Sequence, residues 1–280
     1  MHFTIIAEDA GRAVEKIRSA LPNTALREQS GTPNVKKLEL ETSADEVALE
    51  AKVKELADTF DVFFYDKKPG LVVFDMDSTL IKNGCIDLIA KRAGVEPQVA
   101  EITERAMRGE LDFQQSLQER VGLLKGIDSR TIYSDLVKEI EITPGARELC
   151  AGLRSHGIKT AVLSGGFQPI VDWIKGELGL DYAFANHLVA DKESGLLTGH
   201  TTGAIVDGQR KAELLTQIAA ENEIPLNAVV AVGDGSNDLP MMAKAGYGIA
   251  WHAKPLVRAR APSQLNSESL ADILYVFGLA

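Results

Sequence analysis

The feature that most constrains the fold is a short apolar run that ends in two aspartates. Residues 71–80 read LVVFDMDSTL, in which Leu71–Phe74 has strand character and Asp75 and Asp77 follow directly. In an open α/β sheet, ligands bind at the carboxyl ends of the strands. Two acids separated by one residue can point from such a tip into one pocket, where a hard cation with oxygen ligands offsets their repulsion. One carboxylate could then attack a phosphorus atom while the other moves protons.

Strand-like and helix-like runs alternate along the rest of the chain. The strand-like runs are KTAVLSGG from Lys159, AVVAVGD from Ala228 and YGIAW from Tyr247, each apolar nearly throughout. Parallel strands that are buried on both faces have this composition. We therefore expect an α/β fold with a doubly wound, mainly parallel sheet. The segment from Tyr182 to Thr201, with Gly195 near its turn, predicts a β-hairpin.

A long insertion separates the first two of these strands. Residues 84–142 carry helical periodicity and few strand signals. Because the insertion leaves the sheet beside the acidic strand tip, it is well placed to cover a site there. We expect it to form a helical cap.

The first 68 residues predict a small α+β domain that precedes the sheet. Its elements alternate in the order βαββαβ, with helices expected at Ala10–Ala20 and Ala44–Phe60. This order is typical of a ferredoxin-like fold and resembles the amino-acid-binding modules called ACT domains. An accessory or dimerising domain without a ligand is an equal alternative. Residues 67–70 form the expected linker, so that the two domains span residues 1–68 and 69–280.

Composition argues against several classes of partner. The chain has 280 residues and 45% hydrophobic content, enough for a large core without metal or disulfide support. A formal charge of −10 speaks against a nucleic acid or an anionic membrane as the main partner. Cys85 and Cys150 form no close pair, and no run approaches the roughly 18 apolar residues of a membrane span. We expect a cytoplasmic protein and leave its oligomeric state open, a homodimer included.

Polar groups also follow the second strand-like run and open a later helix. Ser164 and Gly165 follow the run TAVL, before a helix expected from Phe167 to Leu178. Oriented backbone amides at such a tip can cradle a phosphate, although glycines equally favour a plain strand-to-helix turn. Lys211 is expected to open a helix after a turn at residues 207–210. A lysine at a helix start is usually solvated, so its interest depends on its neighbours.

A second acidic strand tip lies in the run VGDGSNDLPMM. Asp234 ends an apolar strand, and Asn237 and Asp238 follow within the next turn. The glycines on either side of Asp234 allow the backbone to approach a ligand closely. The run lacks the third glycine of a dinucleotide-binding fingerprint, which excludes that function. Together with the first acidic tip, it favours a ligand site over a solvated acidic loop.

In this order, these motifs resemble those of the haloacid dehalogenase superfamily of phosphatases. The matching segments are DMDST at 75–79, SGGF at 164–167, GQRKAELL at 208–215 and GDGSNDLPM at 233–241. The insertion, with ITERAMRGELDFQQSLQERVGLLKG, is similar to the phosphoserine phosphatase family in particular. Four ordered motifs are far more specific than any one of them. The resemblance covers the chain from about residue 71 to its end.

The resemblance implies a role for each of the motif residues. Asp75 would be the nucleophile that forms an aspartyl-phosphate, and Asp77 the general acid and base. Mg²⁺ would be held by Asp75, the backbone carbonyl of Asp77, and Asp234. The resemblance also implies that Asp238 orients the metal site from outside it and that Asn237 assists near the phosphate. It further implies that the transferring phosphoryl group is bound by Ser164, Gly165 and Lys211.

Three residues of the insertion also receive roles from the resemblance. Arg120 would bind the substrate carboxylate, which a guanidinium can meet with two hydrogen bonds. Phe113 and Met107 would line and close the pocket, while plain packing is an equal alternative for Met107. Phosphoserine phosphatases place a glutamate for the substrate ammonium where this chain has Gly84. Asp87 lies three residues further, where a helix could turn it away. Either a water molecule or Asp87 could compensate for the missing carboxylate, or activity on phosphoserine could be reduced.

The function implied is the Mg²⁺-dependent hydrolysis of O-phosphoserine to serine and phosphate, the last step of serine biosynthesis. Two alternatives stay open at this point. Because Gly84 removes the expected carboxylate, the substrate could be another small phosphate monoester. Alternatively, the N-terminal domain could bind an amino acid, with the chain acting chiefly as a sensor.

Overall fold

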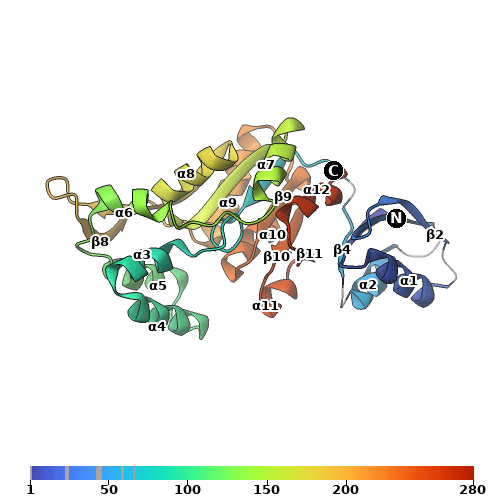
Figure 1. Cartoon of the computed structure of the whole chain (residues 1–280), viewed down its shortest axis with the longest axis horizontal. Coiled ribbons are helices and arrows are strands. Elements are labelled where there is room, and N and C mark those ends of the chain that lie inside the picture. The colour runs from blue at the N-terminus through green and yellow to red at the C-terminus, as the bar shows by residue number, and fades with distance from the viewer. Residues whose placement is uncertain (1, 23–24, 42–45, 58–59, 66) are drawn as a thin grey trace.

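The computed structural model describes residues 2–22, 25–41, 46–57, 60–65 and 67–280 (Figure 1). Within these residues the strands form two sheets, one of four strands and one of seven. Among the helices described, none has both the length and the apolar character that crossing a bilayer would require.

The four-stranded sheet is antiparallel and is built by the N-terminal elements. Its strands lie in the order β2-β3-β1-β4. Along the chain the elements follow the predicted βαββαβ order: β1 (His2–Ile6), α1 (Ala10–Ala20), β2 (Ala25–Gly31), β3 (Val35–Glu41), α2 (Glu46–Leu56) and β4 (Asp61–Phe63). The predicted ends of the second helix, residues 44–45 and 58–59, lie outside the described residues. Buried side chains of both helices and of the sheet, among them Ile5, Ile17 and Val53, form a core of their own.

Contacts around β4 join the four-stranded sheet to the rest of the protein. The Asp61 carboxylate accepts hydrogen bonds from the backbone N–H of Asn266 at 2.6 Å and from its side chain at 2.9 Å. The Tyr65 ring lies 5.0 Å from the ring of Tyr247 and 5.5 Å from that of Phe277. Two hydrogen bonds and two aromatic contacts therefore join the two sheets. The division at residues 68 and 69 and the ACT-like character of the first unit stay predictions.

The seven-stranded sheet is parallel except at one edge, as predicted. Its strands lie in the order β11-β10-β9-β5-β6-β7-β8. Of the described strand pairs in this sheet, only β7 and β8 are antiparallel. These two form the predicted hairpin. The strands are β5 (Leu71–Phe74), β6 (Lys159–Phe167), β7 (Tyr182–Ala190), β8 (Leu197–Thr202), β9 (Val229–Gly233), β10 (Tyr247–Trp251) and β11 (Ser263–Leu265). In register, Phe74 lies between Val162 and Val232, so β5, β6 and β9 end side by side.

Helices cover both faces of this sheet, because alternate residues of its strands are apolar on each side. Val72 and Phe74 pack with α7, α8 and α12, whereas Leu71 and Val73 pack with α9 and α10. This arrangement confirms the doubly wound α/β fold. The helices that follow the insertion are α7 (Ala146–Ser155), α8 (Gln168–Leu178), α9 (Gly208–Glu221), α10 (Leu239–Lys244), α11 (Pro255–Arg258) and α12 (Ile273–Val276), with single 3-10 turns η1 (Leu226–Ala228), η2 (Ser236–Asp238) and η3 (Leu270–Asp272).

The insertion between β5 and β6 is helical. Its helices are α3 (Cys85–Ala93), α4 (Glu96–Met107), α5 (Phe113–Gly122) and α6 (Ser129–Leu136). Helices α3, α4 and α5 lie at the end of the molecule opposite to α1 and α2 (Figure 1). The helix α5 begins at a capping box, in which Asp112 and Gln115 each bond the other's backbone N–H. This cap fixes the start of the helix that carries Phe113 and Arg120.

The structure corrects two local expectations. Ser164 and Gly165 do not follow β6 but lie within it, because β6 continues to Phe167 through a register shift. At the shift the Gly166 N–H donates to Ser164 Oγ at 2.9 Å. Lys211 does not open a helix either. The α9 helix begins three residues earlier, at Gly208, since Asp207 caps it by accepting from the Arg210 N–H at 2.9 Å.

Candidate active site

The site is built where three neighbouring parallel strands end. Asp75 follows β5, Asp234 follows β9, and Ser164 lies near the end of β6. The Asp75 N–H donates to the Val232 carbonyl at 2.9 Å, which extends the pairing of β5 and β9 by one residue. Each strand is apolar and buried up to its tip, so the first polar side chain after it is delivered to the same edge of the sheet.

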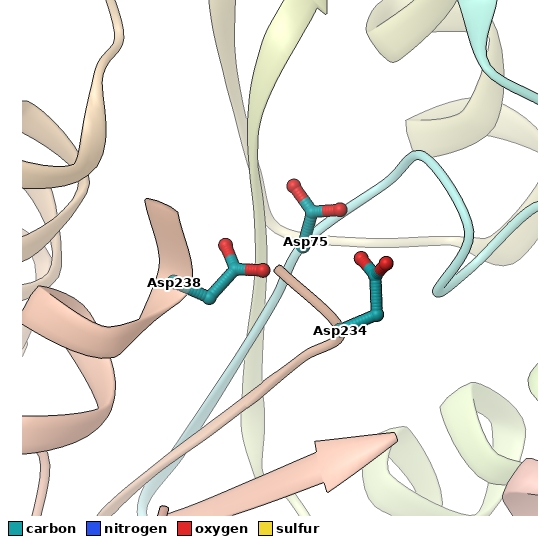
Figure 2. A group of neighbouring side chains, drawn as sticks. All are labelled: Asp75, Asp234 and Asp238. Carbon is teal, nitrogen blue, oxygen red and sulfur yellow. The ribbon is translucent and has the colours of Figure 1, made fainter. Parts of the chain in front are cut away.

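Three carboxylates meet at this edge. Oxygens of Asp75, Asp234 and Asp238 lie within 4.8 Å of one another, and Figure 2 shows the three groups brought together from the segments after β5 and β9. Three carboxylate oxygens at this spacing form a donor set that suits a hard divalent cation. The set overlaps the predicted metal ligands at Asp75 and Asp234, and Asp238 lies beside them.

Lys211 is the cation that this cluster contains. Its side chain is fully buried and donates to Asp75 Oδ1 and, at 2.7 Å, to Asp238 Oδ1. Burial lowers the pKa of Lys211, but the charges of Asp238 and Asp75 more than offset this and raise it above the usual range. Burial raises the pKa of Asp75. The charge of Lys211 opposes this increase, and the charges of the neighbouring carboxylates add to it. The cluster therefore has an excess of negative charge that a cation would neutralise.

Asp234 and Asp238 differ in how the protein holds them. Burial, reinforced by the charge of Asp238, raises the pKa of Asp234 to about 7. Asp238 is fully buried, and its second oxygen accepts from the Gly235 N–H at 3.0 Å. Both of its oxygens are thus engaged, by Lys211 and by Gly235. The expected role of Asp238, to orient the metal site from outside it, stays a prediction.

The side chain of Asp77 lies outside the three-carboxylate cluster. Its Oδ1 accepts from the backbone N–H of Cys85 at 3.2 Å, at the start of α3. Burial raises the pKa of Asp77 to about 6, although the hydrogen bonds from Cys85 oppose the change. Such a pKa lets the group both give and take a proton near neutral pH. The expected metal contact of its backbone carbonyl stays a prediction.

The segment 164–166 forms the opposite wall of the site. A Cβ on Gly166 would lie 3.1 Å from Ser164 Oγ and 3.4 Å from Asp77 Oδ2, so both polar side chains reach over this glycine. The Gly165 carbonyl accepts from Asn186 Nδ2 at 2.9 Å, and Asn186 Oδ1 accepts from the Val206 N–H at 2.8 Å. Asn186 therefore ties the segment to the loop before α9.

Sequence reasoning did not find Asn186. The signal was present, because a lone asparagine in the apolar strand run YAFANHLVA is out of place unless its amide has partners. The residue is 2% exposed, which makes those partners obligatory. Gln114 was missed as well; its side chain donates to Asp207 Oδ2 at 2.8 Å and joins the insertion to the cap of α9.

Phe113 reaches from α5 to the segment 164–166, and its role in lining and closing the pocket stays a prediction. A Cβ on Gly165 would lie 2.7 Å from the Phe113 Cζ atom, so the ring is in close contact with the glycine backbone. The backbone of Met107 ends α4, but its side chain lies outside the described part of the structure. Asn237 lies in the turn η2, where its carbonyl closely approaches Gly208 at the start of α9. Its predicted role stays a prediction.

Arg120, on α5, lies close enough to Asp87 and to Asp77 for their charges to interact. Burial lowers the pKa of Arg120, and the charges of Asp87 and Asp77 oppose this change. The sequence left open whether the helix turns Asp87 away from position 84, and the structure shows that it does not. Its carboxylate instead bends back to Gly84, where a Cβ would be 3.4 Å from the Asp87 Cγ atom.

Comparison with known proteins gives a consistent match. A family model described as haloacid dehalogenase-like hydrolase matches residues 69–246. The phosphoserine phosphatase of Saccharomyces cerevisiae is 53% identical over 214 residues, which are 76% of this chain and 69% of the yeast protein. A solved HAD family hydrolase from Salmonella enterica serovar Typhi has a TM-score of 0.88 at 30% identity, over 99% of this chain and 97% of that one.

A second solved structure bears on the chemistry of the site. It is a phospho-aspartyl intermediate analogue of a phosphoserine phosphatase, with a TM-score of 0.70 at 44% identity. The match covers 75% of this chain and the whole of that one. The solved structures thus include one that matches three quarters of this chain and one that matches nearly all of it.

Proposed function

This chain belongs to the haloacid dehalogenase-like hydrolase family, and we propose that it is a Mg²⁺-dependent phosphatase that hydrolyses O-phosphoserine to serine and phosphate. The observation that carries the proposal is the position of Arg120. Its guanidinium interacts electrostatically with both Asp77 and Asp87. A substrate whose phosphate reaches Asp75 can therefore place a carboxylate on Arg120. The yeast relative, named a phosphoserine phosphatase, supports this substrate over the two alternatives.

In the proposed reaction Asp75 is the nucleophile. Lys211 occupies one of its oxygens and leaves the other to attack phosphorus. As the bond from phosphorus to the serine oxygen breaks, Asp77 gives that oxygen its proton. The product is an aspartyl-phosphate on Asp75 and free serine. Asp77, now ionised, takes a proton from a water molecule that attacks phosphorus and releases phosphate from Asp75.

The remaining groups bind and orient the phosphoryl group. We assign Ser164, the Gly165 N–H and Lys211 to its oxygens, because positioning and charge stabilisation supply most of the catalysis in phosphoryl transfer. Asp75, Asp234 and the Asp77 carbonyl would hold Mg²⁺, with Asp238 fixing Lys211 beside them. When bound, the ion would offset the repulsion between a carboxylate and an anionic phosphate. A cytoplasmic location and a homodimer stay predictions from the sequence.

Phosphate release from O-phosphoserine by the purified protein tests the proposal. We expect turnover that needs Mg²⁺, is lost in EDTA and is lost in Asp75→Asn. Rapid quenching with labelled substrate should trap label on the protein in the unsubstituted chain and none in the variant. Equal phosphate release by the two proteins would contradict the mechanism. Turnover of other small phosphate monoesters, with none of O-phosphoserine, would leave a phosphatase but reject this substrate.

A further inference from the structure

The carboxylate of Asp87 occupies the space in which a side chain at position 84 would begin. Gly84 caps α3 with φ −93° and ψ 122°, an ordinary extended conformation that any residue adopts. A Cβ atom there would overlap Asp87 Oδ2 and would lie 3.4 Å from Asp87 Cγ. A side chain at 84 would therefore displace the Asp87 carboxylate from this position, although the backbone itself would accept any residue. The start of α3, where the positive end of the helix dipole lies, favours a negative charge at this place.

Other polar side chains of this segment are engaged elsewhere. Lys82 pairs with Glu141 at 3.2 Å, and Asn83 Oδ1 accepts from the Glu141 N–H at 2.8 Å. Asp87, by contrast, is exposed, so that a ligand can reach its carboxylate. The carboxylates of Glu96 and Asp77 lie close enough for their negative charges to repel that of Asp87. A cation is therefore favoured at this position.

Asp87 and Arg120 attract each other but are not directly paired. Their charges interact, yet within the described residues no salt bridge of 4.0 Å or less joins them. A directly paired guanidinium and carboxylate would satisfy each other, whereas this pair leaves room between its charges. An α-amino acid carries its ammonium and carboxylate on one carbon atom. The two side chains thus present one negative and one positive charge, which are complementary to the two charges of such a zwitterion.

We propose that Asp87 binds the ammonium group of the substrate, in place of the glutamate that the family resemblance implies at position 84. The inference rests on the proposed hydrolysis of O-phosphoserine and names the residue that sets its amino-acid specificity. Arg120 takes the substrate carboxylate, Asp87 takes the ammonium, and Asp75 meets the phosphate. The carboxylate that a glutamate at position 84 would provide is thus supplied by Asp87, three residues later in the same segment.

The experiment compares two substrates that differ only in the ammonium group. Steady-state hydrolysis of O-phosphoserine and of the phosphate ester of β-hydroxypropionate is measured for the unsubstituted chain, Asp87→Asn and the matched control Glu96→Gln. We expect Asp87→Asn to raise KM for O-phosphoserine at least about tenfold and to leave hydrolysis of the ester that lacks the ammonium nearly unchanged. Glu96→Gln should retain the preference for O-phosphoserine.

The outcomes separate this inference from the proposed function. If the unsubstituted chain hydrolyses p-nitrophenyl phosphate but not O-phosphoserine, the proposed substrate fails and the inference fails with it. If O-phosphoserine is hydrolysed and Asp87→Asn changes both substrates equally, or neither, only the inference is overturned.

A charge relocation gives an independent check. Gly84→Glu alone should not improve O-phosphoserine hydrolysis, because its Cβ overlaps Asp87 and the two carboxylates repel. Asp87→Ala should lose the preference for the substrate with an ammonium. The double variant Gly84→Glu with Asp87→Ala should regain much of it. Failure of the double variant to exceed Asp87→Ala, with both proteins shown to be folded by circular dichroism, would overturn the inference.

Discussion

Lys211 donates a hydrogen bond to Asp238 at 2.7 Å in a place closed to solvent, and the same ammonium also donates to Asp75. The lysine thus fixes the predicted nucleophile to a carboxylate of another strand loop. The positive charge of Lys211 lies among three carboxylates, which it cannot neutralise alone. We therefore expect both catalysis and folding to depend on this side chain.

Replacing Lys211 by methionine should therefore affect both properties. We expect Lys211→Met to lower kcat at least about 100-fold, because a fixed positive charge beside the transferring phosphoryl group is lost. It should also lower the free energy of unfolding by about 3–5 kcal/mol, the usual cost of leaving a buried charge unpaired. Phosphate release and thermal unfolding measure the two effects.

Arg210→Met is the matched control for this change. Arg210 precedes Lys211 in the same helix, and its guanidinium pairs with Glu213 at 3.2 Å near the surface. Such surface pairs contribute about 0–1 kcal/mol. Arg210→Met should therefore leave both kcat and the midpoint of unfolding almost unchanged. An equal loss in the two variants would show that the helix, and not the buried charge, is responsible.

The carboxylates predict an unusual pH dependence of stability in the absence of metal. Burial raises the pKa of Asp234 to about 7, from the 3.8 of a free aspartate. In the unfolded chain the group ionises near 3.8, so between about pH 4 and pH 7 the folded protein binds more protons. The contribution of Asp234 to the free energy of unfolding therefore falls as the pH rises through this range.

Thermal unfolding in EDTA, from about pH 4 to pH 8, measures this contribution. The decline with rising pH should be smaller in Asp234→Asn than in the unsubstituted chain, and the difference between the two curves is the observable. Mg²⁺ should stabilise the unsubstituted chain more at the upper end of the range, because a cation binds the ionised carboxylates. Parallel curves for the two proteins would rule out a raised pKa at Asp234.

Much of this site was predictable from the sequence because it depends on local patterns. An apolar strand run followed by an acid places the acid at a strand tip, and parallel strands end at one edge of a sheet. Asp75 and Asp234 were predicted to meet for this reason, and they do. The fold class follows from the same runs, since strands that are buried on both faces need helices on both sides.

What the sequence did not reveal depends on side-chain direction and on contacts distant along the chain. The sequence left open whether its helix turns Asp87 away, and only the structure shows that its carboxylate bends back into the space left free at Gly84. Asn186 has partners 21 and 20 residues away, which no local pattern connects. The start of α9 was misplaced although Asp207, a common helix cap, marked it.

Close packing of the insertion on the site gives a further prediction. Gly165→Ala should lower kcat/KM at least about tenfold, because its new methyl group would meet the Phe113 ring and displace either the ring or the phosphoryl-binding segment. Gly176→Ala on α8 is the control, since its Cβ would meet nothing within 4 Å. Combining Gly165→Ala with Phe113→Leu should cost less than the sum of the separate losses. Additive losses would mean that the two residues act independently.

Asn186 provides the last prediction, because its two hydrogen bonds hold the backbone of Gly165 to that of Val206. Asn186→Ala would leave a buried carbonyl and a buried N–H without partners, at a cost of about 1–3 kcal/mol each in the free energy of unfolding. Because Gly165 lies in the predicted phosphoryl-binding segment, kcat should fall as well.

Asn222→Ala separates the two effects of the Asn186 change. Asn222 also uses its side-chain amide internally, donating to the Ile218 carbonyl at 2.7 Å and to the Tyr182 hydroxyl at 2.8 Å, but it contacts none of the site residues. Its replacement should lower the midpoint of unfolding and leave kcat within about twofold, as expected for a purely structural amide. We expect Asn186→Ala to lower both quantities, measured by thermal unfolding and by phosphate release well below that midpoint. A loss of stability without a loss of kcat in Asn186→Ala would show that the segment 164–166 keeps its geometry without this amide.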